Sequence, residues 1–176
     1  MSRSILSSCV LRLCILCLVA LMAHAPSLSA QTADAPEART AREVLAIVQR
    51  LFDAMRTRDT ATMRSLFAPG ARLVGVRTRQ SGEVVTQSLT ADQFADYVAR
   101  DTRAPWVERA WSPEVRVRGT LATVWAEYDF HFGTQFSHCG VDAVQLLDVP
   151  GRGWQIVSIA DTFETQGCPS RPPVKP

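Results

Sequence analysis

The sequence predicts an α+β fold, in which three helices from the N-terminal half pack on the concave face of a cone-shaped, strongly bent antiparallel sheet of about six strands. Three observations predict it. Apolar residues recur at three- and four-residue spacing after Ala41, which is typical of an amphipathic helix. Residues 107–163 show apolar segments separated by glycine-containing turns, which is typical of antiparallel strands. The predicted helices precede the long strands instead of alternating with them.

The first thirty residues have the pattern of a signal peptide. Arg3 precedes an apolar run that Arg12 interrupts, and Leu28-Ser29-Ala30 offers a small residue for cleavage before Gln31. The run is too short and interrupted for a membrane span. We therefore expect a periplasmic or secreted protein without membrane contact after cleavage. The expected organisation is residues 1–30 signal peptide, 31–40 polar linker, 41–168 folded domain and 169–176 disordered tail.

Removal of the signal peptide leaves a chain without net charge. The whole chain has 19 Lys and Arg and 17 Asp and Glu, so losing Arg3 and Arg12 leaves 17 of each. This balance argues against nucleic acid or an anionic membrane surface as a partner.

Two helices are expected first. The longer one runs from Ala41 to near Asp59, and a shorter one follows with Thr60 as its N-cap. The shorter helix turns Met63 and Phe67 inward and stops before Pro69-Gly70. The apolar positions of the first helix are Val44, Leu45, Val48, Leu51, Phe52 and Met55.

A hairpin and a third helix come next. Residues 72–79 and 83–89 form the hairpin strands. Thr90 and Gln93 have the spacing of a capping box, which starts a helix that ends near Arg100. Its inward side chains are expected to be Phe94 and Tyr97.

The last third is expected to form a four-stranded meander. Its strands are residues 107–118, interrupted at Ser112-Pro113, then 123–132, 135–148 and 154–163. Gly133-Thr134 gives a two-residue turn, and residues 150–153 give a four-residue turn. This register places Asp129 opposite His138, Trp125 opposite Asp142, and Asp142 opposite Asp161.

Because side chains alternate along a strand, that register gathers polar side chains on one face. We assign this face to a cavity under the helices, since apolar residues lie on it too. The opposite face is also apolar, so the outward assignment stays open. The face contains Trp125, Glu127, Asp129, His131, Phe136, His138, Asp142, Asp161 and Phe163.

Carboxylates beside an imidazole are suited to acid–base chemistry. We expect His138 to be the general base, Asp129 to orient it, and Asp142 with Asp161 to be the acid, because neighbouring carboxylates raise each other's pKa. The expected ligand-binding residues are Trp125, Glu127, His131, Phe136 and Phe163.

Structural alternatives remain for these residues. His138 could be a core histidine, Arg77 or Arg79 could pair with the acids, and the aromatic residues could be plain core. No metal site is expected, because the spacing of His131 and His138 matches no recognised ligand pattern. No cofactor is expected, because the chain contains no glycine-rich phosphate loop.

Two cysteines, Cys139 and Cys168, remain after cleavage. The register places Cys139 opposite Glu164, so a chain that turns back after Phe163 can close a disulfide. The alternatives are one buried and one exposed thiol, or a nucleophilic Cys139.

These elements resemble the nuclear-transport-factor-2-like superfamily. The long first helix, Arg58-Asp59-Thr60 leading into residues 63–67, and GWQIV at residues 153–157 carry the resemblance. The segments VWAEYDF at 124–130 and FSHCGVD at 136–142, with the closing Gly167-Cys168, are similar to the bacterial group labelled "putative lumazine-binding". That group often has Pro at the position of Glu127.

The superfamily also serves ketosteroid isomerase and scytalone dehydratase. The resemblance implies a cavity into which Asp161 points, and a homodimer formed through the outer face of the sheet. We therefore expect an exported small-ligand-binding protein. A cofactor-free isomerase, dehydratase or hydrolase and a binding protein without turnover both fit, and the alternative is a non-catalytic protein-interaction or accessory module.

Overall fold

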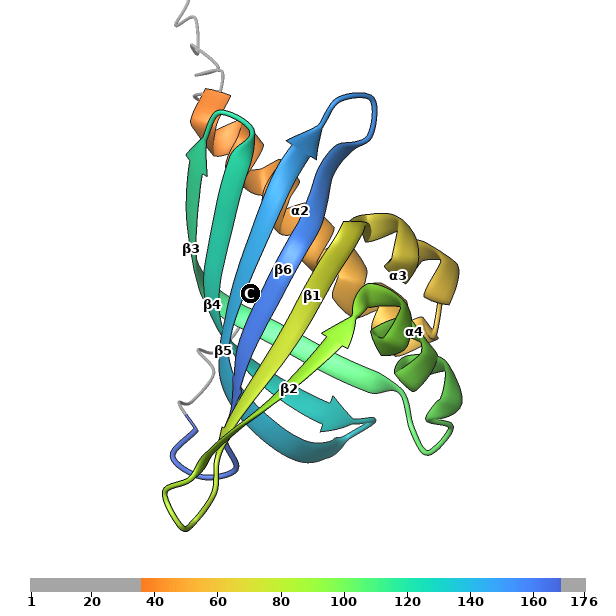
Figure 1. Ribbon diagram of the computed structural model, residues 1–176, viewed down its shortest axis with the longest axis vertical. Coiled ribbons are helices and arrows are strands. Elements are labelled where there is room, and N and C mark those ends of the chain that lie inside the picture. The colour runs from red at the N-terminus through yellow and green to blue at the C-terminus, as the bar shows by residue number, and fades with distance from the viewer. Residues whose placement is uncertain (1–35, 169–176) are drawn as a thin grey trace, which may run out of the picture. The chain divides into compact units, whose positions relative to one another are not determined.

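The computed structural model describes residues 36–168, which form three helices and six strands (Figure 1). The predicted signal peptide and the predicted C-terminal tail lie outside the described residues. The helices are α2 (Pro36–Thr57), α3 (Thr60–Leu66) and α4 (Ala91–Arg100). The strands are β1 (Phe67–Thr78), β2 (Val84–Thr90), β3 (Trp106–Arg118), β4 (Leu121–Phe132), β5 (Gln135–Val149) and β6 (Gly153–Phe163).

Helix α2 begins at Pro36, five residues before the predicted start. The prediction of a linker was therefore wrong for residues 36–40. Proline suits the first turn of a helix, where its missing N–H has no partner to lose, and Glu37 complements the helix dipole there. The apolar side of the helix is buried as predicted, with Val44 and Leu51 almost inaccessible.

The two shorter helices have side-chain caps. Asp59, not the predicted Thr60, caps α3 by accepting a hydrogen bond from the Thr62 amide at 3.0 Å. In α4 the predicted capping box is present: Thr90 Oγ1 accepts from the Gln93 amide, and Gln93 Oε1 accepts from the Thr90 amide.

Two further predictions about these helices were wrong. Strand β1 begins at Phe67, directly after α3, so Pro69-Gly70 lies within a strand. Tyr97 is 47% exposed, because Ala95 and Val98 occupy the buried side of α4.

The six strands form one curved sheet in the order β2-β1-β6-β5-β4-β3 (Figure 1). Strand β1 pairs with β6 in parallel, and the other neighbours are antiparallel. The sheet is therefore mixed and not purely antiparallel as predicted. Parallel neighbouring strands need a long connection. Here the connection from β1 to β6 consists of β2, α4, β3, β4 and β5.

One face of the sheet, called the inner face below, packs against the helices, and the other is called the outer face. The inner face provides most of the apolar core together with α2. Its buried strand residues include Val124, Ala126, Tyr128, Phe130, Val144, Leu146, Ile156 and Ile159.

A β-bulge changes the register between β4 and β5. The two-residue turn is as predicted, since Phe132 pairs with Gln135. The pairing then shifts by one residue at Ser137, so His138 lies opposite Phe130 and Asp129 lies opposite Cys139. A shift of one residue exchanges the two faces of a strand relative to its neighbour. The predicted pairing of Asp129 with His138 is therefore wrong.

The same shift separates Trp125 from Asp142. Asp142 pairs with Ala126, and Trp125 pairs with Ala143. The β4 residues Trp125, Glu127, Asp129 and His131 consequently lie on the outer face, whereas the acidic residues of β5 and β6 lie on the inner face.

Between β5 and β6, two deviations from the prediction cancel. The turn has three residues, because Val149 pairs with Gly153, and a second bulge at Val157 moves the register back by one. The predicted pairing of Asp142 with Asp161 is confirmed for this reason. The bridge between Cys139 and Glu164 is confirmed as well.

Candidate functional site

A cavity of about 390 Å³ lies between the inner face and the helices. Its helix-derived lining is apolar: Val48, Leu51, Phe52, Met55 and Phe94. Aromatic side chains from the strands form further walls: Trp106, Phe130, Phe132 and Phe163. Four aliphatic side chains of the strands also line it: Leu73, Val144, Ile156 and Ile159. The polar or ionisable lining comes from all the strands except β2: Arg77, Glu108, Tyr128, Ser137, His138, Asp142 and Asp161.

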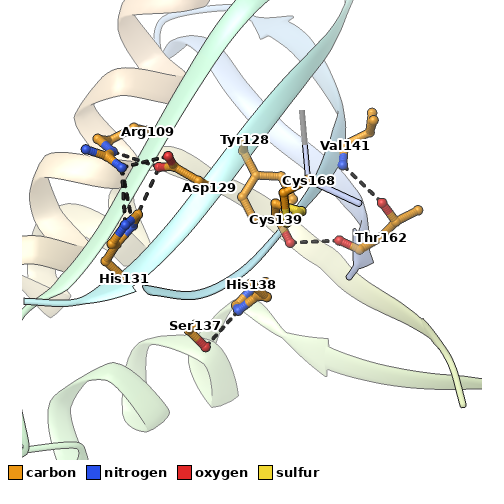
Figure 2. Close-up of a disulfide and its surroundings, with 10 residues drawn as sticks. All are labelled: Arg109, Tyr128, Asp129, His131, Ser137, His138, Cys139, Val141, Thr162 and Cys168. Atoms are coloured by element: carbon orange, nitrogen blue, oxygen red, sulfur yellow. Dashed lines mark hydrogen bonds and ion pairs between the residues drawn. A yellow bond between two sulfur atoms is a disulfide. The ribbon is translucent and has the colours of Figure 1, made fainter. Parts of the chain in front are cut away.

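His138 lies in this wall as one layer of a stack of rings. Its imidazole stacks on Phe163 at 3.7 Å and on Phe130 at 4.9 Å between ring centroids. Its Nδ1 is 3.0 Å from the Ser137 hydroxyl (Figure 2). Burial, helped by the positive charge of Arg77, lowers the pKa of His138 to about 4. The imidazole is therefore neutral at physiological pH.

The stack continues beyond Phe163, where the guanidinium carbon of Arg77 lies 3.7 Å from the ring centroid. Arg79 pairs instead with Glu83 at 2.8 Å. Neither arginine forms an ion pair with Asp142 or Asp161, so the alternative in which an arginine neutralises these acids is not supported.

Asp142 and Asp161 face each other directly across β5 and β6. Asp142 is only 4% exposed, and no hydrogen-bond donor of the described residues reaches its buried Oδ2. Burial raises the pKa of Asp142 to about 7, and the nearby Asp161 adds to the rise. Burial likewise raises the pKa of Asp161 to about 6.

A third acid that was not predicted from the sequence, Glu108 of β3, also lines the cavity. Burial is the main cause that raises its pKa well above the usual range, followed by the negative charge of Asp142. A hydrogen bond between the two raises the pKa of Glu108 and lowers that of Asp142, so Glu108 holds the proton and Asp142 accepts it. One signal could have identified Glu108: it shares strand parity with Trp106 and Ala110, which pack on the core.

Tyr128 lies beside these acids. Its hydroxyl donates to the carbonyl oxygen of Thr162 at 2.8 Å (Figure 2). Burial and the neighbouring acids raise its pKa, so the phenol keeps its proton. The backbone of β6 approaches here because residue 140 is glycine: a Cβ at Gly140 would overlap the Thr162 carbonyl.

The outer face holds the predicted site residues of β4. Arg109 donates to both carboxylate oxygens of Asp129, at 2.7 and 2.6 Å, and His131 lies 3.6 Å from the same carboxylate. Figure 2 shows this cluster apart from His138. Trp111 donates to Glu127 at 2.6 Å.

Two predicted ligand-binding aromatics also lie outside the cavity. Trp125 is 56% exposed on the outer face, and Phe136 is 45% exposed beside the turn between β4 and β5. Neither lines the cavity. Of the predicted site residues, the cavity therefore brings together His138, Asp142, Asp161 and Phe163, and it excludes Trp125, Glu127, Asp129, His131 and Phe136.

The predicted disulfide between Cys139 and Cys168 is present, with the two Cα atoms 5.8 Å apart (Figure 2). It joins β5 to the segment that follows β6. Because Cys139 is buried and bonded, it is not a thiol nucleophile.

Residues 36–168 contain neither a side-chain cluster that could hold a metal ion nor a helix that could span a membrane. No group of three His, Cys, Asp or Glu side chains there is arranged to hold a metal ion. None of the described helices is both long enough and apolar enough to cross a membrane.

Solved structures share this fold at low sequence identity. A nuclear transport factor 2 (NTF2-like) superfamily protein from Salmonella enterica has a TM-score of 0.59 at 15% identity, covering 74% of this chain and 95% of its own. A "putative dehydratase from the NTF2-like family" from Streptomyces avermitilis has a TM-score of 0.54 at 15% identity, covering 73% and 99%. The β subunit of a "putative aromatic-ring-hydroxylating dioxygenase" from Novosphingobium aromaticivorans has a TM-score of 0.59 at 13% identity, covering 73% and 92%.

No curated protein matched the chain. By sequence, residues 39–160 match the family described as "Putative lumazine-binding". The match spans more than half of the 176 residues and almost all of the described fold. The chain therefore belongs to the "Putative lumazine-binding" family and has the fold of the nuclear-transport-factor-2-like superfamily.

Proposed function

We propose that this protein binds a small, mostly apolar, planar molecule in the cavity of its inner face and can transfer protons to and from it. One observation carries the proposal: a cavity of about 390 Å³ whose apolar and aromatic walls converge on three carboxyl groups. Ligand sites are commonly concave and apolar with a few convergent polar groups. The family description and the dehydratase among the similar structures agree with a small-molecule ligand.

The acid and base differ from those expected from sequence. A general base works best when its pKa lies just below the working pH, and a general acid when it still holds its proton. Asp161, with a pKa of about 6, is the base in this proposal. Glu108, which donates to Asp142, is the acid. His138 is a wall of the cavity, since its imidazole is neutral and held in the ring stack.

Export and dimerisation belong to the same proposal. The disulfide supports a periplasmic or secreted location, because such bonds persist in oxidising compartments. The exposed Trp125 on the outer face supports a homodimer formed through the sheet. The accessory-module alternative predicts a filled interior, and the cavity beside His138 argues against it.

Native mass spectrometry of the purified protein tests binding and subunit number together. We expect a dimer carrying one small molecule per chain, which is lost under denaturing conditions. Protein that carries no molecule, and whose thermal stability no metabolite pool raises, would contradict the binding proposal. A monomer would contradict the dimer alone.

Proton transfer has its own test with the recovered molecule. Incubated with the protein in D₂O, the molecule should gain deuterium at carbon, and Asp161→Asn should slow the exchange by about 100-fold. Asp129→Asn is the matched control, because it changes a carboxylate on the other face of the sheet. Equal exchange rates in both variants would remove Asp161 as the base and leave binding unaffected.

A further inference from the structure

The hydroxyl and indole donors that line the cavity are already used by the protein. The Tyr128 hydroxyl donates to Thr162 O, and the Ser137 hydroxyl lies in hydrogen-bond contact with His138. The indole N–H of Trp106 donates at 3.0 Å to a carboxylate that does not line the cavity. The Tyr128 hydroxyl also reaches Asp161, but its single proton serves one acceptor at a time. Apart from Arg77, the cavity therefore has few donors left for a ligand.

Its acceptors, by contrast, are in excess. Glu108, Asp142 and Asp161 place three carboxyl groups in one wall. Apart from the one proton that Glu108 shares with Asp142, no donor of the described residues reaches the buried Asp142 Oδ2. A buried acceptor without a partner costs about 1–3 kcal/mol. Proteins rarely leave such an atom unsatisfied unless a ligand or water serves it. A ligand that donates a hydrogen bond to Asp142 would therefore satisfy this oxygen.

The charges around the acids also favour a cation. Arg77 is the one cationic side chain among the described residues that line the cavity, and it lies over the Phe163 ring. His138 covers the other face of that ring at 3.7 Å and is neutral. Helices α2 and α4 contribute only apolar side chains to the cavity. On the outer face, Asp129 adds negative charge near Glu108.

From this placement we propose that the ligand is a planar aromatic molecule with a cationic N–H group, such as an amidine or a protonated amino-heterocycle, which donates to Asp142. The rings of Trp106, Phe130 and Phe132 would enclose its apolar part. The inference rests on the proposed binding function and names its ligand class. In this inference the negative charge of the carboxyl groups selects a cationic ligand, in addition to the shape of the cavity.

Proton release should accompany binding. Asp142, with a pKa of about 7, and Asp161, with a pKa of about 6, still hold protons in part of the molecules at slightly acidic pH. A bound cation favours their ionised forms, so protons leave as it enters. Affinity for a permanent cation should then rise with pH between about 5.5 and 7.5, and fall when acid returns the protons.

Three probes of one shape separate charge from shape: 2-naphthamidine, 2-naphthamide and 2-naphthoate. Isothermal titration calorimetry in buffers of different ionisation enthalpy measures affinity and protons released. We expect the amidine to bind at least tenfold more tightly than the amide at pH 7.5, with the carboxylate weakest. Asp142→Asn should reduce the preference for the amidine to about twofold, whereas Asp129→Asn should preserve it.

The outcomes separate this inference from the proposed function. Binding of the amide or the carboxylate as tightly as the amidine overturns the cation preference and leaves a small-molecule cavity standing. Binding of none of the three by folded protein overturns both. A preference that survives in Asp142→Asn, with a native circular dichroism spectrum, overturns the role of Asp142. Amidine affinity that falls as pH rises also overturns the inference.

Discussion

The two faces of one sheet use the same residue types in opposite ways. On the outer face, Asp129 accepts two hydrogen bonds from Arg109. On the inner face, Asp142 has no cationic partner, and its nearest charged neighbours are further carboxyl groups. A paired carboxylate stabilises a fold, whereas an unpaired buried one destabilises it and becomes available for a ligand.

Alternation along β4 illustrates the difference. Tyr128 and Phe130 point to the cavity side, while Asp129 between them points to Arg109. A single position along the strand thus decides whether a side chain belongs to the candidate site or to a surface ion pair. The donors that face a carboxylate therefore determine whether it forms a structural ion pair or remains available to a ligand.

The largest expected effect comes from neutralising the inner carboxylate. The pKa of Asp142 is about 7 in the folded protein against an ordinary value of 3.8, a difference of roughly three units that is on the order of 4 kcal/mol. We expect Asp142→Asn to raise the free energy of unfolding at pH 8 by about 2–4 kcal/mol. Asp129→Asn should lower it by about 1 kcal/mol, since it weakens a charge-assisted pair. Urea denaturation measures both.

The sign of the pH dependence follows from the protons bound in each state. Between pH 4 and 7 the unfolded chain has lost the Asp142 proton and the folded chain still holds it, so stability falls as pH rises. Asp161 contributes in the same direction between about pH 4 and 6. The fall should be smaller in Asp142→Asn. An Asn variant less stable than the wild type at pH 8 would mean that a cation pairs with Asp142.

Most of the fold was predictable because local patterns determine it. The capping box at Thr90, the buried side of α2 and the turn at Gly133-Thr134 each depend on residues close in sequence. The parallel pairing of β1 with β6 depends on residues far apart, and no local pattern encodes it. Long-range strand pairing is therefore the part that sequence reasoning reached least well.

The candidate site was predicted only in part, for a similar reason. A bulge adds one residue without a strong signal of its own, and the bulge at Ser137 exchanged the faces of residues 121–130 of β4 relative to the paired residues of β5. Asp142 and Asp161 remained correct because the short turn and the bulge at Val157 compensated each other. The role of Asp129 was lost and Glu108 was overlooked through this one-residue shift.

A second prediction concerns the glycine on which the inner arrangement depends. Gly140→Ala would push a methyl group into the Thr162 carbonyl, which accepts from Tyr128. We expect a loss of about 3 kcal/mol in the free energy of unfolding, because the clash is with backbone that cannot move aside easily. The Arg109–Asp129 ion pair lies on the outer face, so it does not offset this loss of stability.

Gly75→Ala is the matched control for that substitution. A Cβ there would lie 3.6 Å from the Asp161 carboxylate, which is an ordinary contact distance. Its effect should stay within about 1 kcal/mol, helped by the reduced freedom of the unfolded chain. Equal denaturation midpoints for the two alanine variants would show that β5 and β6 do not approach as closely as described.

At pH 8 the smallest effect is expected at His138, and its change with pH decides between a base and a core histidine. His138→Phe keeps a ring between Phe130 and Phe163, so stability at pH 8 should change by no more than about 1 kcal/mol. We define the gain as the free energy of unfolding of the variant minus that of the wild type. This gain should be about 2 kcal/mol larger at pH 5 than at pH 8. The reason is that the unfolded imidazole takes a proton below pH 6.5, and the folded one does so only near its pKa of about 4. Denaturation curves at both pH values measure this difference.

If acid destabilises wild type and variant equally, the folded imidazole takes up its proton as readily as the unfolded one. His138 would then regain the role of base. The inner face would contain an imidazole with an ordinary pKa beside carboxyl groups whose pKa values are raised.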